Sequence, residues 1–160
     1  MTRHLPRMAV AAVLTAALLA VGGRRHGSPR VAPVVPPRPA SAGQAAAAAV
    51  AAEFVAALTR VDAAHPHGDL ATLQRLCTPG VLHRLQAVAA LPAAVLRASG
   101  AQRGTVLAVA TRVAGDRAVA QVSAALTDTT DGRPAVRTAA AYTVTLTWGA
   151  GRWRVVGVTA

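Results

Sequence analysis

The chain has 160 residues, 53% of them apolar, so it has room for one folded domain and an appendage and is too apolar for a disordered chain. All 17 basic residues are arginines, and together with the abundant alanine this is typical of a GC-rich genome. The net charge is +11, but residues 1–42 hold six arginines and no acid, which leaves +5 for residues 43–160. Because the later arginines stand singly in the sequence and only four residues are aromatic, we expect no nucleic-acid binding.

Residues 1–27 have the form of an N-terminal signal or signal-anchor segment. Arg3 and Arg7 come first, and residues 8–23 then run without a charge. As a helix these sixteen residues would span about 24 Å, less than the ~30 Å hydrocarbon core of a membrane. Arg24 and Arg25 follow at once, which favours an anchor over a cleavage site. We therefore expect a single pass through a bacterial cytoplasmic membrane with the C-terminal domain outside; secretion after signal cleavage is the alternative.

Residues 28–44 read SPRVAPVVPPRPASAGQ and are rich in proline. Proline disfavours helices and sheets and promotes an extended polyproline conformation. This stretch is therefore predicted to be a linker between the membrane segment and a domain over residues 45–160.

Three helices are predicted in the first part of that domain. Residues 45–61 combine strong helix formers with an apolar stripe of Val50, Phe54, Leu58 and Val61. Asp69 is expected to cap a second helix, and Thr78 and Pro79 are expected to open a third. The inward-facing residues of these two helices are expected to be Leu70, Leu73, Leu76, Val81, Leu82, Leu85 and Val88.

The pattern changes from helical to alternating after Gly100. Residues 136–148 place apolar side chains on one face of a long strand, and Arg137 and three threonines on the other. Similar alternation over residues 105–113, 118–126 and 152–158 predicts three more strands, with turns between them. Helices followed by an antiparallel sheet with one buried face predict an α+β domain, in which the helices cover the four-stranded sheet.

Three segments of this domain resemble a known superfamily: FVAALTRVD in the first helix, TPGVLHRL at the third helix and YTVTLTWGAGRWRVVGV in the closing hairpin. They are similar to the cone-shaped fold shared by nuclear transport factor two, ketosteroid isomerase and scytalone dehydratase. Within that superfamily, a membrane segment, a linker and a cone resemble two groups. These are the inner-membrane scaffold proteins of conjugal transfer and type IV secretion, and the Mce-associated membrane proteins of actinobacteria. The resemblance implies a part in assembly rather than in chemistry.

The chain offers few residues for catalysis. Enzymes of the cone fold use an acid in an apolar cavity to move protons. Four of the six acids are predicted to be cap or turn residues: Asp69, Asp116, Asp128 and Asp131. The other two, Glu53 and Asp62, lie off the apolar stripe of the first helix, and Tyr142 is predicted to face the core. We therefore assign no catalytic residue and expect a non-enzymatic protein.

His65, His67 and Asp69 have the residue types of a metal site, but Pro66 and Gly68 predict a solvated loop and no fourth ligand accompanies them. The lone Cys77 can form no internal disulfide, and the apolar helical pattern around it predicts that it is buried. We expect neither a metal nor a cofactor.

Trp148 and Trp153 flank the final turn, and we expect them to pack on each other across the hairpin and close one end of the core. The leading hypothesis is a non-enzymatic structural or adaptor domain of a bacterial envelope assembly. It would contact the membrane through residues 8–23 and protein partners through its sheet or the mouth of the cone. The alternative is a small-molecule-binding or catalytic cone of the ketosteroid isomerase type. The sequence leaves homo-oligomer formation open.

Overall fold

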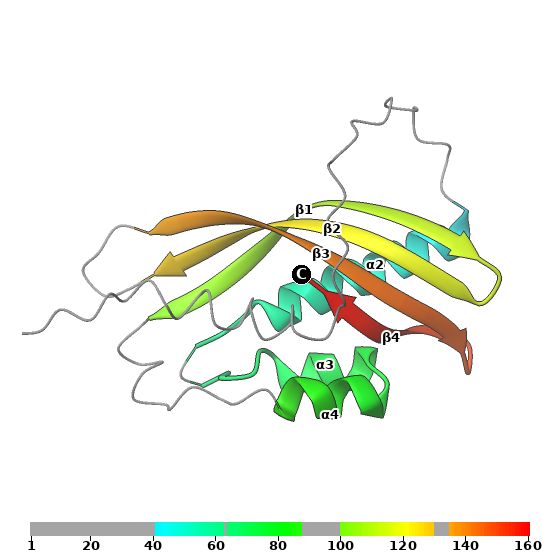
Figure 1. Cartoon of the computed structure of the whole chain (residues 1–160), viewed down its shortest axis with the longest axis horizontal. Coiled ribbons are helices and arrows are strands. Elements are labelled where there is room, and N and C mark those ends of the chain that lie inside the picture. Colours follow the sequence, from blue (N-terminus) through cyan, green and yellow to red (C-terminus); the bar gives the residue numbers. More distant parts are fainter. Residues whose placement is uncertain (1–40, 63, 88–99, 130–134) are drawn as a thin grey trace, which may run out of the picture.

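The computed structural model of the chain describes residues 41–62, 64–87, 100–129 and 135–160. They form the helices α2 (Ala42–Leu58), α3 (Leu70–Leu76) and α4 (Pro79–Ala87), and the strands β1 (Ala101–Ala114), β2 (Arg117–Thr129), β3 (Val136–Gly149) and β4 (Arg152–Thr159) (Figure 1). The strands pair in chain order as one antiparallel sheet, and the helices pack against it. The predicted α+β class is therefore confirmed.

The predicted membrane segment, residues 8–23, lies outside the described residues, as does the predicted linker up to residue 40. Within the part of the chain that the structure describes, no helix is long and apolar enough to cross a membrane.

The first described helix, α2, begins earlier than the sequence predicts. Ser41 is its N-cap, and the Ser41 side chain accepts a hydrogen bond from the backbone N–H of Gln44 at 3.2 Å. Residues 42–44, which we expected in the linker, are therefore helical. Alanine, the strongest helix former, fills most of α2. The residues that α2 buries are Ala47, Ala51, Phe54, Val55, Ala57 and Leu58.

The helix α2 ends at Leu58, before the predicted end at Val61. The Thr59 hydroxyl donates to the backbone carbonyl four residues earlier at 2.7 Å. Val61 then exchanges two backbone hydrogen bonds with Gln102, of 3.0 and 2.8 Å, and so covers the start of the edge strand β1. The end of α2 approaches β1 closely because residue 104 is glycine: a Cβ on Gly104 would stand 2.1 Å from the Thr59 Oγ1.

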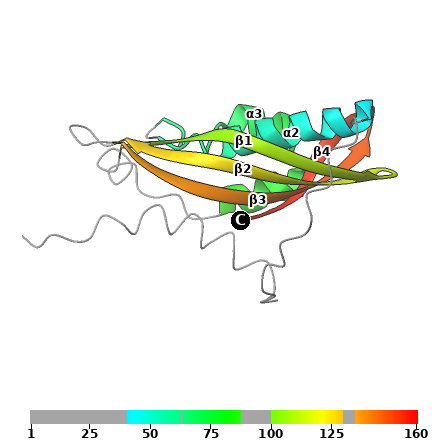
Figure 2. The same ribbon diagram turned by 90° about the horizontal axis from the view of Figure 1, so that it is seen from above.

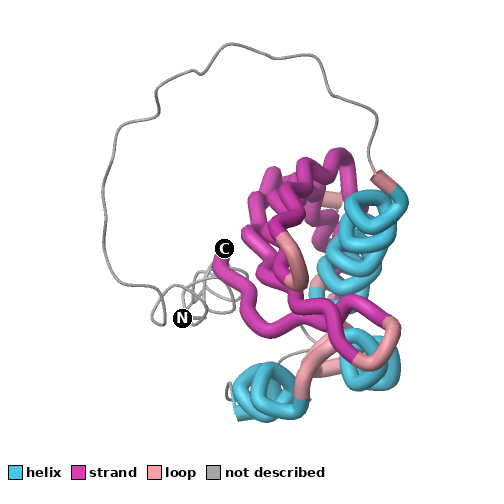
Figure 3. The backbone as a smooth tube through the Cα atoms, turned by 90° about the vertical axis from the view of Figure 1, so that its right-hand side faces the viewer, coloured by secondary structure: helices cyan, strands magenta, loops and turns pink. Residues whose placement is uncertain are grey.

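The helices α3 and α4 lie beside β4 (Figures 1 and 3). Asp69 caps α3, as predicted, by accepting a hydrogen bond from the N–H of Thr72 at 3.2 Å. Pro79 opens α4, also as predicted. The hydroxyl of Thr78, which we expected to cap α4, donates instead to the carbonyl of Val155 at 3.3 Å, and the Thr78 N–H donates to the same carbonyl at 3.0 Å. The segment between α3 and α4 thereby holds the outer edge of β4.

The helices cover one face of the sheet, which we call the covered face; Figure 2 shows α2 and α3 together on one side of the long, curved strands. The buried apolar residues of this face are Ala118, Ala120, Val122, Ala124 and Leu126 on β2, Tyr142, Val144 and Leu146 on β3, and Trp153 and Val155 on β4. They occupy every second position of each strand, because successive side chains of a strand point to opposite faces. Short alanine side chains on β2 leave room for α2 to pack closely on the sheet.

Candidate interaction surface

The other face of the sheet, the open face, carries the residues that alternate with the buried ones. Among the described residues it holds six of the nine arginines and none of the five acids. The six are Arg103, Arg112, Arg117, Arg137, Arg152 and Arg154. All are exposed except Arg154, which is half-buried. Arginines that stand singly in the sequence are therefore gathered on one surface by the fold.

A first row of open-face residues crosses β1, β2 and β3. Arg103 on β1 and Arg137 on β3 stand on either side of Thr127 on β2, because each of them pairs with that threonine in the strand register. The backbones of the two arginines are two strand spacings, or about 10 Å, apart. We call these three residues the first arginine row.

A second row repeats the arrangement at the other end of the sheet. Arg117 on β2 and Arg154 on β4 stand on either side of Thr147 on β3. Two more arginines lie on the outer strands near this row: Arg112 on β1, opposite Val119, and Arg152 on β4, opposite Gly149. Ten residues separate the first row from the second along β2 and along β3, so these rows lie about 33 Å apart. We call the three paired residues the second arginine row.

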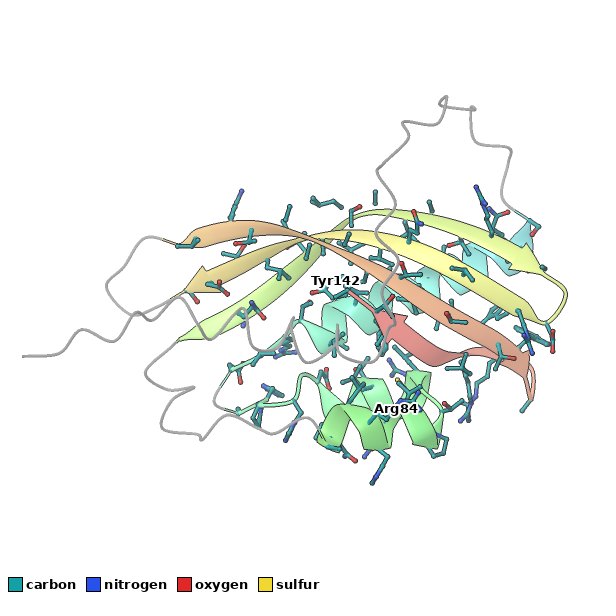
Figure 4. All side chains as sticks on the ribbon, viewed as in Figure 1. Arg84 and Tyr142 are labelled. Carbon is teal, nitrogen blue, oxygen red and sulfur yellow. The ribbon has the colours of Figure 1, made fainter. Side chains whose placement is uncertain are left out.

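Between the two rows the open face is made mostly of small, uncharged side chains, and its one charged residue on β1–β3 is Arg112, which lies opposite Val119 near the second row. The uncharged residues of these three strands are Thr105, Ala108, Ala110, Val119, Gln121, Ser123, Ala125, Ala139, Ala141, Thr143 and Thr145. Two large apolar residues are exposed here: Val119, at 44%, and Leu107, at 65%, where the register of β1 shifts. Figure 4 shows short side chains along the upper side of the sheet, with nitrogen-tipped ones toward its ends.

The described acids lie off the open face. Glu53 on α2 forms an ion pair with Arg75 on α3, and both side chains are largely exposed. Asp69 is the cap of α3, and Asp116 lies in the turn between β1 and β2, beyond the end of the face. Asp128, which we predicted in a turn, lies in β2 instead, on the covered-face side. The remaining acid, at position 131, lies outside the described residues.

Asp62 shapes the loop between α2 and α3. Its carboxylate accepts hydrogen bonds from the N–H groups of Ala64 at 2.9 Å and His65 at 2.8 Å, and it contacts Nδ1 of His65 at 2.9 Å. The side-chain hydrogen bond with His65 is the main reason why the pKa of Asp62 is lowered. Within the described residues no three histidine, cysteine or acidic side chains gather as metal ligands, so His67 and Asp69 do not join His65 in such a site.

Among the described residues, the acid on the covered-face side of the sheet lies far from Tyr142. Tyr142 points from β3 toward the helices (Figure 4), and burial raises its pKa. Arg84, also labelled there, donates from α4 to the carbonyl of Val156 at 3.3 Å. Asp128 is the acid of this side of the sheet, but it lies six residues beyond Val122, the pairing partner of Tyr142. That separation is about 20 Å along β2.

Trp148 and Trp153 pack across the hairpin between β3 and β4, as predicted. Their ring centroids are 5.4 Å apart and their planes meet at 67°, an edge-to-face contact. Trp153 is 5% exposed and Trp148 is 47% exposed, so Trp148 closes the end of the core over Trp153. Cys77 is buried, also as predicted, and burial raises the pKa of its thiol to about 11.

No protein-family model matches the chain, and no curated protein matches it. Six chains of solved structures match it, among them the intermembrane space region of the chloroplast protein ARC6. The identity to that region is 16% and the TM-score is 0.38, over 70% of this chain and 94% of that one. A likeness of this size identifies no family and no function.

Proposed function

We propose that this chain is a non-enzymatic adaptor domain of a bacterial envelope assembly, held on the outer side of the cytoplasmic membrane by residues 8–23. The segregation of charge on the sheet carries the proposal. The open face collects two-thirds of the described arginines and none of the described acids. Exposed charges add little to folding stability, whereas a surface of one sign steers and orients a partner. A binding role explains such a surface better than a structural role does.

The sequence before the domain supports the tether. The helix α2 begins at Ala42, so the proline-rich stretch between the uncharged segment and the domain covers residues 28–40. Thirteen residues in an extended polyproline conformation span about 40 Å. A domain at that distance from the membrane keeps its open face free for a partner.

The arrangement of helices on one face of an antiparallel sheet is compatible with the cone-shaped superfamily of nuclear transport factor two, and we assign the domain to it as part of this proposal. Within that superfamily, the inner-membrane scaffolds of conjugal transfer and type IV secretion and the Mce-associated proteins have the same order of membrane segment, linker and cone. A role in such an assembly follows from this likeness. The alternative, a catalytic cone, draws less support because Asp128 and Tyr142 are far apart.

The proposal is tested with the full chain in bacterial cells. We expect it in the membrane fraction, with the domain cut by external protease after removal of the wall. A photo-crosslinking residue at Ala141, on the open face, should give covalent adducts with envelope proteins. The same residue at Ala56, on the exposed side of α2, is the matched control and should give none.

A chain found in the cytosol would contradict the tether, and equal adducts from Ala141 and Ala56 would contradict the adaptor surface. Tyr142→Phe distinguishes the alternative, because it removes only the phenol oxygen of a side chain that is otherwise kept in the core. Loss of biological activity in this variant, with adducts from Ala141 retained, would support a catalytic cone instead.

A further inference from the structure

We infer that the open face binds an acidic amphipathic helix of a partner protein. The helix lies along the strands, from the first arginine row to the second. The inference rests on the proposed adaptor function and names the chemistry of the partner. Arginine is suited to this task because its planar guanidinium donates two parallel hydrogen bonds to one carboxylate.

The dimensions of the rows match a helix. Arg103 and Arg137 start about 10 Å apart, on either side of Thr127, and an α-helix with its side chains is about 10–12 Å wide. A helix end placed over Thr127 would therefore have an arginine on each flank. Arg117 and Arg154 flank Thr147 in the same way. The ~33 Å between the rows corresponds to about 22 helical residues at 1.5 Å each.

The surface between the rows suits the middle of such a helix. Alanine and threonine side chains are short, so a helix can approach the sheet closely. Val119 and Leu107 are the exposed large apolar residues of this stretch, and they would bury against the apolar side of the helix. The expected partner thus carries carboxylates near both ends of its helix and small or apolar residues along the middle of the contacting side.

Two partners that the chain itself could supply for this surface are excluded because they carry the same charge as the open face. The first is a second copy, because a symmetric dimer through this surface brings open face to open face. The described open face has six arginines and no acid, so neither copy would offer a carboxylate to the other. The second is the N-terminal segment, where residues 1–40 contain six arginines and no acid. Both arrangements would bring like charges together, which costs free energy.

Nucleic acid and membrane lipid fit the surface less well than a helix does. A phosphate backbone carries charge along its whole length, whereas most of the stretch of about 33 Å between the rows is uncharged, with Arg112 as its one arginine, near the second row. Single strands also need aromatic platforms, and all four aromatic residues of the chain lie off the open face. A lipid surface is flat, whereas a sheet twists by about 20–25° from each strand to the next, so arginines on different strands do not lie in one plane.

The test uses the purified full chain in nanodiscs of phosphatidylcholine and a fluorescent helical peptide of about 22 residues, with glutamates at both ends and apolar residues on one side of the middle. Fluorescence anisotropy measures its binding. A peptide of the same composition with its glutamates in the middle is the arrangement control. Duplex DNA of similar length, and vesicles of phosphatidylcholine and phosphatidylglycerol, are competitors that represent the other two classes of partner.

Charge reversal locates the contact. Arg117→Glu and Arg137→Glu, one from each row, should each weaken binding of the peptide by about tenfold or more. Arg60→Glu makes the same charge change at an exposed site off the open face and should alter binding by less than about twofold. A peptide with lysines at one end should regain binding to one of the two reversed variants and not to the other. A loss of fold would not produce this end-specific rescue, and circular dichroism checks the fold directly.

Equal binding of the two peptides, or of Arg117→Glu and the unaltered chain, would overturn the inference. Preferential binding of DNA or of anionic vesicles, with displacement of the peptide, would overturn it in favour of that partner class. The membrane location of the chain is a separate readout. A chain that sits in the membrane but ignores the acidic peptide contradicts only the helical partner, whereas a cytosolic chain that binds the peptide contradicts only the envelope location.

Discussion

The two faces of the sheet come from the same four strands but carry opposite chemistry. The covered face has alanine, valine and leucine with Tyr142 and Trp153, all buried by the helices. The open face has threonine, alanine and arginine, and four of its six arginines lie in the two rows. Alternation along each strand keeps these sets apart. The strands β2 and β3 can therefore serve folding with their even positions and recognition with their odd positions, and each face can change without altering the other.

The covered face concentrates stability in a few large side chains. Phe54, Tyr142 and Trp153 are the buried aromatic residues, while alanine fills many of the positions between them. Large side chains contribute most of the apolar area that folding removes from water. Substitutions should therefore divide by face: those on the covered face should change stability, and those on the open face should change binding.

Removal of Trp153 should give the largest effect. Trp153→Ala leaves a cavity at a residue that is 5% exposed, and it should lower the free energy of unfolding by about 3–5 kcal/mol. Trp148→Ala is the matched control, since this ring is 47% exposed and should cost clearly less. Urea unfolding followed by circular dichroism measures both. Equal losses would show that the end of the core depends on the outer ring as much as on the buried one.

High pH should lower the free energy of unfolding through Cys77, which is buried at the end of α3. Burial raises the pKa of this thiol from 9.0 to about 11, so the neutral thiol is the form that the fold favours. The unfolded chain loses its proton first, and the free energy of unfolding should fall between pH 9 and pH 11. The fall is roughly 3 kcal/mol, because each unit of pKa corresponds to about 1.4 kcal/mol.

The control for this pH dependence is Cys77→Ala, which should flatten part of the decline. Tyr142, whose pKa burial also raises, would still contribute to what remains. Alkylation is a second measurement, since Cys77 is the sole cysteine of the chain. At pH 8 its thiolate is about a hundredfold scarcer in the folded than in the unfolded chain, so labelling should require unfolding. Rapid labelling of the folded chain would contradict the burial.

The same substitution at two alanines, one on each face of the sheet, compares the effect of the two faces on stability. Ala120 is fully buried on β2, and Ala141 is exposed on β3. Ala120→Leu adds three carbons to a packed core and should cost about 1–3 kcal/mol. Ala141→Leu adds the same atoms to the open face and should change stability by no more than about 0.5 kcal/mol. Thermal unfolding measures both, and a similar loss in the two variants would mean that the open face is covered in the folded chain.

The sequence predicted which face of the sheet a residue lies on better than it predicted which residue of the next strand lies beside it. The alternation over residues 136–148 correctly assigned Tyr142 to the core and Arg137 to the opposite face. On β2 and β3 the same parity sets Arg117 and Arg137 out of phase with the buried residues, but the register shift between Val106 and Ala108 breaks this parity on β1, so parity alone does not place Arg103. The two rows still could not be read from the sequence, because they depend on which residue of one strand faces which residue of the next.

The errors at the ends of elements have a similar cause. Val61 continues the spacing of the apolar stripe in α2, but it pairs with Gln102, a partner 41 positions later in the sequence. Thr78 has the residue type of a cap, yet its hydroxyl binds the carbonyl of Val155. Local spacing carries no information on such distant partners. The membrane segment and the envelope role stay predictions.

Substitution in the turn between β3 and β4 should give the smallest effect on stability. This turn helps to set which residues of β4 lie on which face of the sheet. Ala150 and Gly151 both have positive φ, 51° and 74°, as a two-residue type I′ turn requires. An L-residue such as alanine is strained there, whereas asparagine tolerates this conformation and Asn-Gly is the preferred pair. Ala150→Asn should therefore raise the free energy of unfolding by about 0.5–1 kcal/mol.

The register that this turn fixes puts Trp153 on the covered face and Arg154 on the open face, and a slip of one residue would exchange them. Ala150→Asn should thus stabilise the hairpin and leave peptide binding unchanged. Ala150→Val is the opposite control, since a β-branched residue is disfavoured at positive φ and should lower the melting temperature. A melting temperature that is the same for both variants would show that the strand pairing alone sets the register. The separation of the two faces would then depend on the packing of Trp153 and not on the turn.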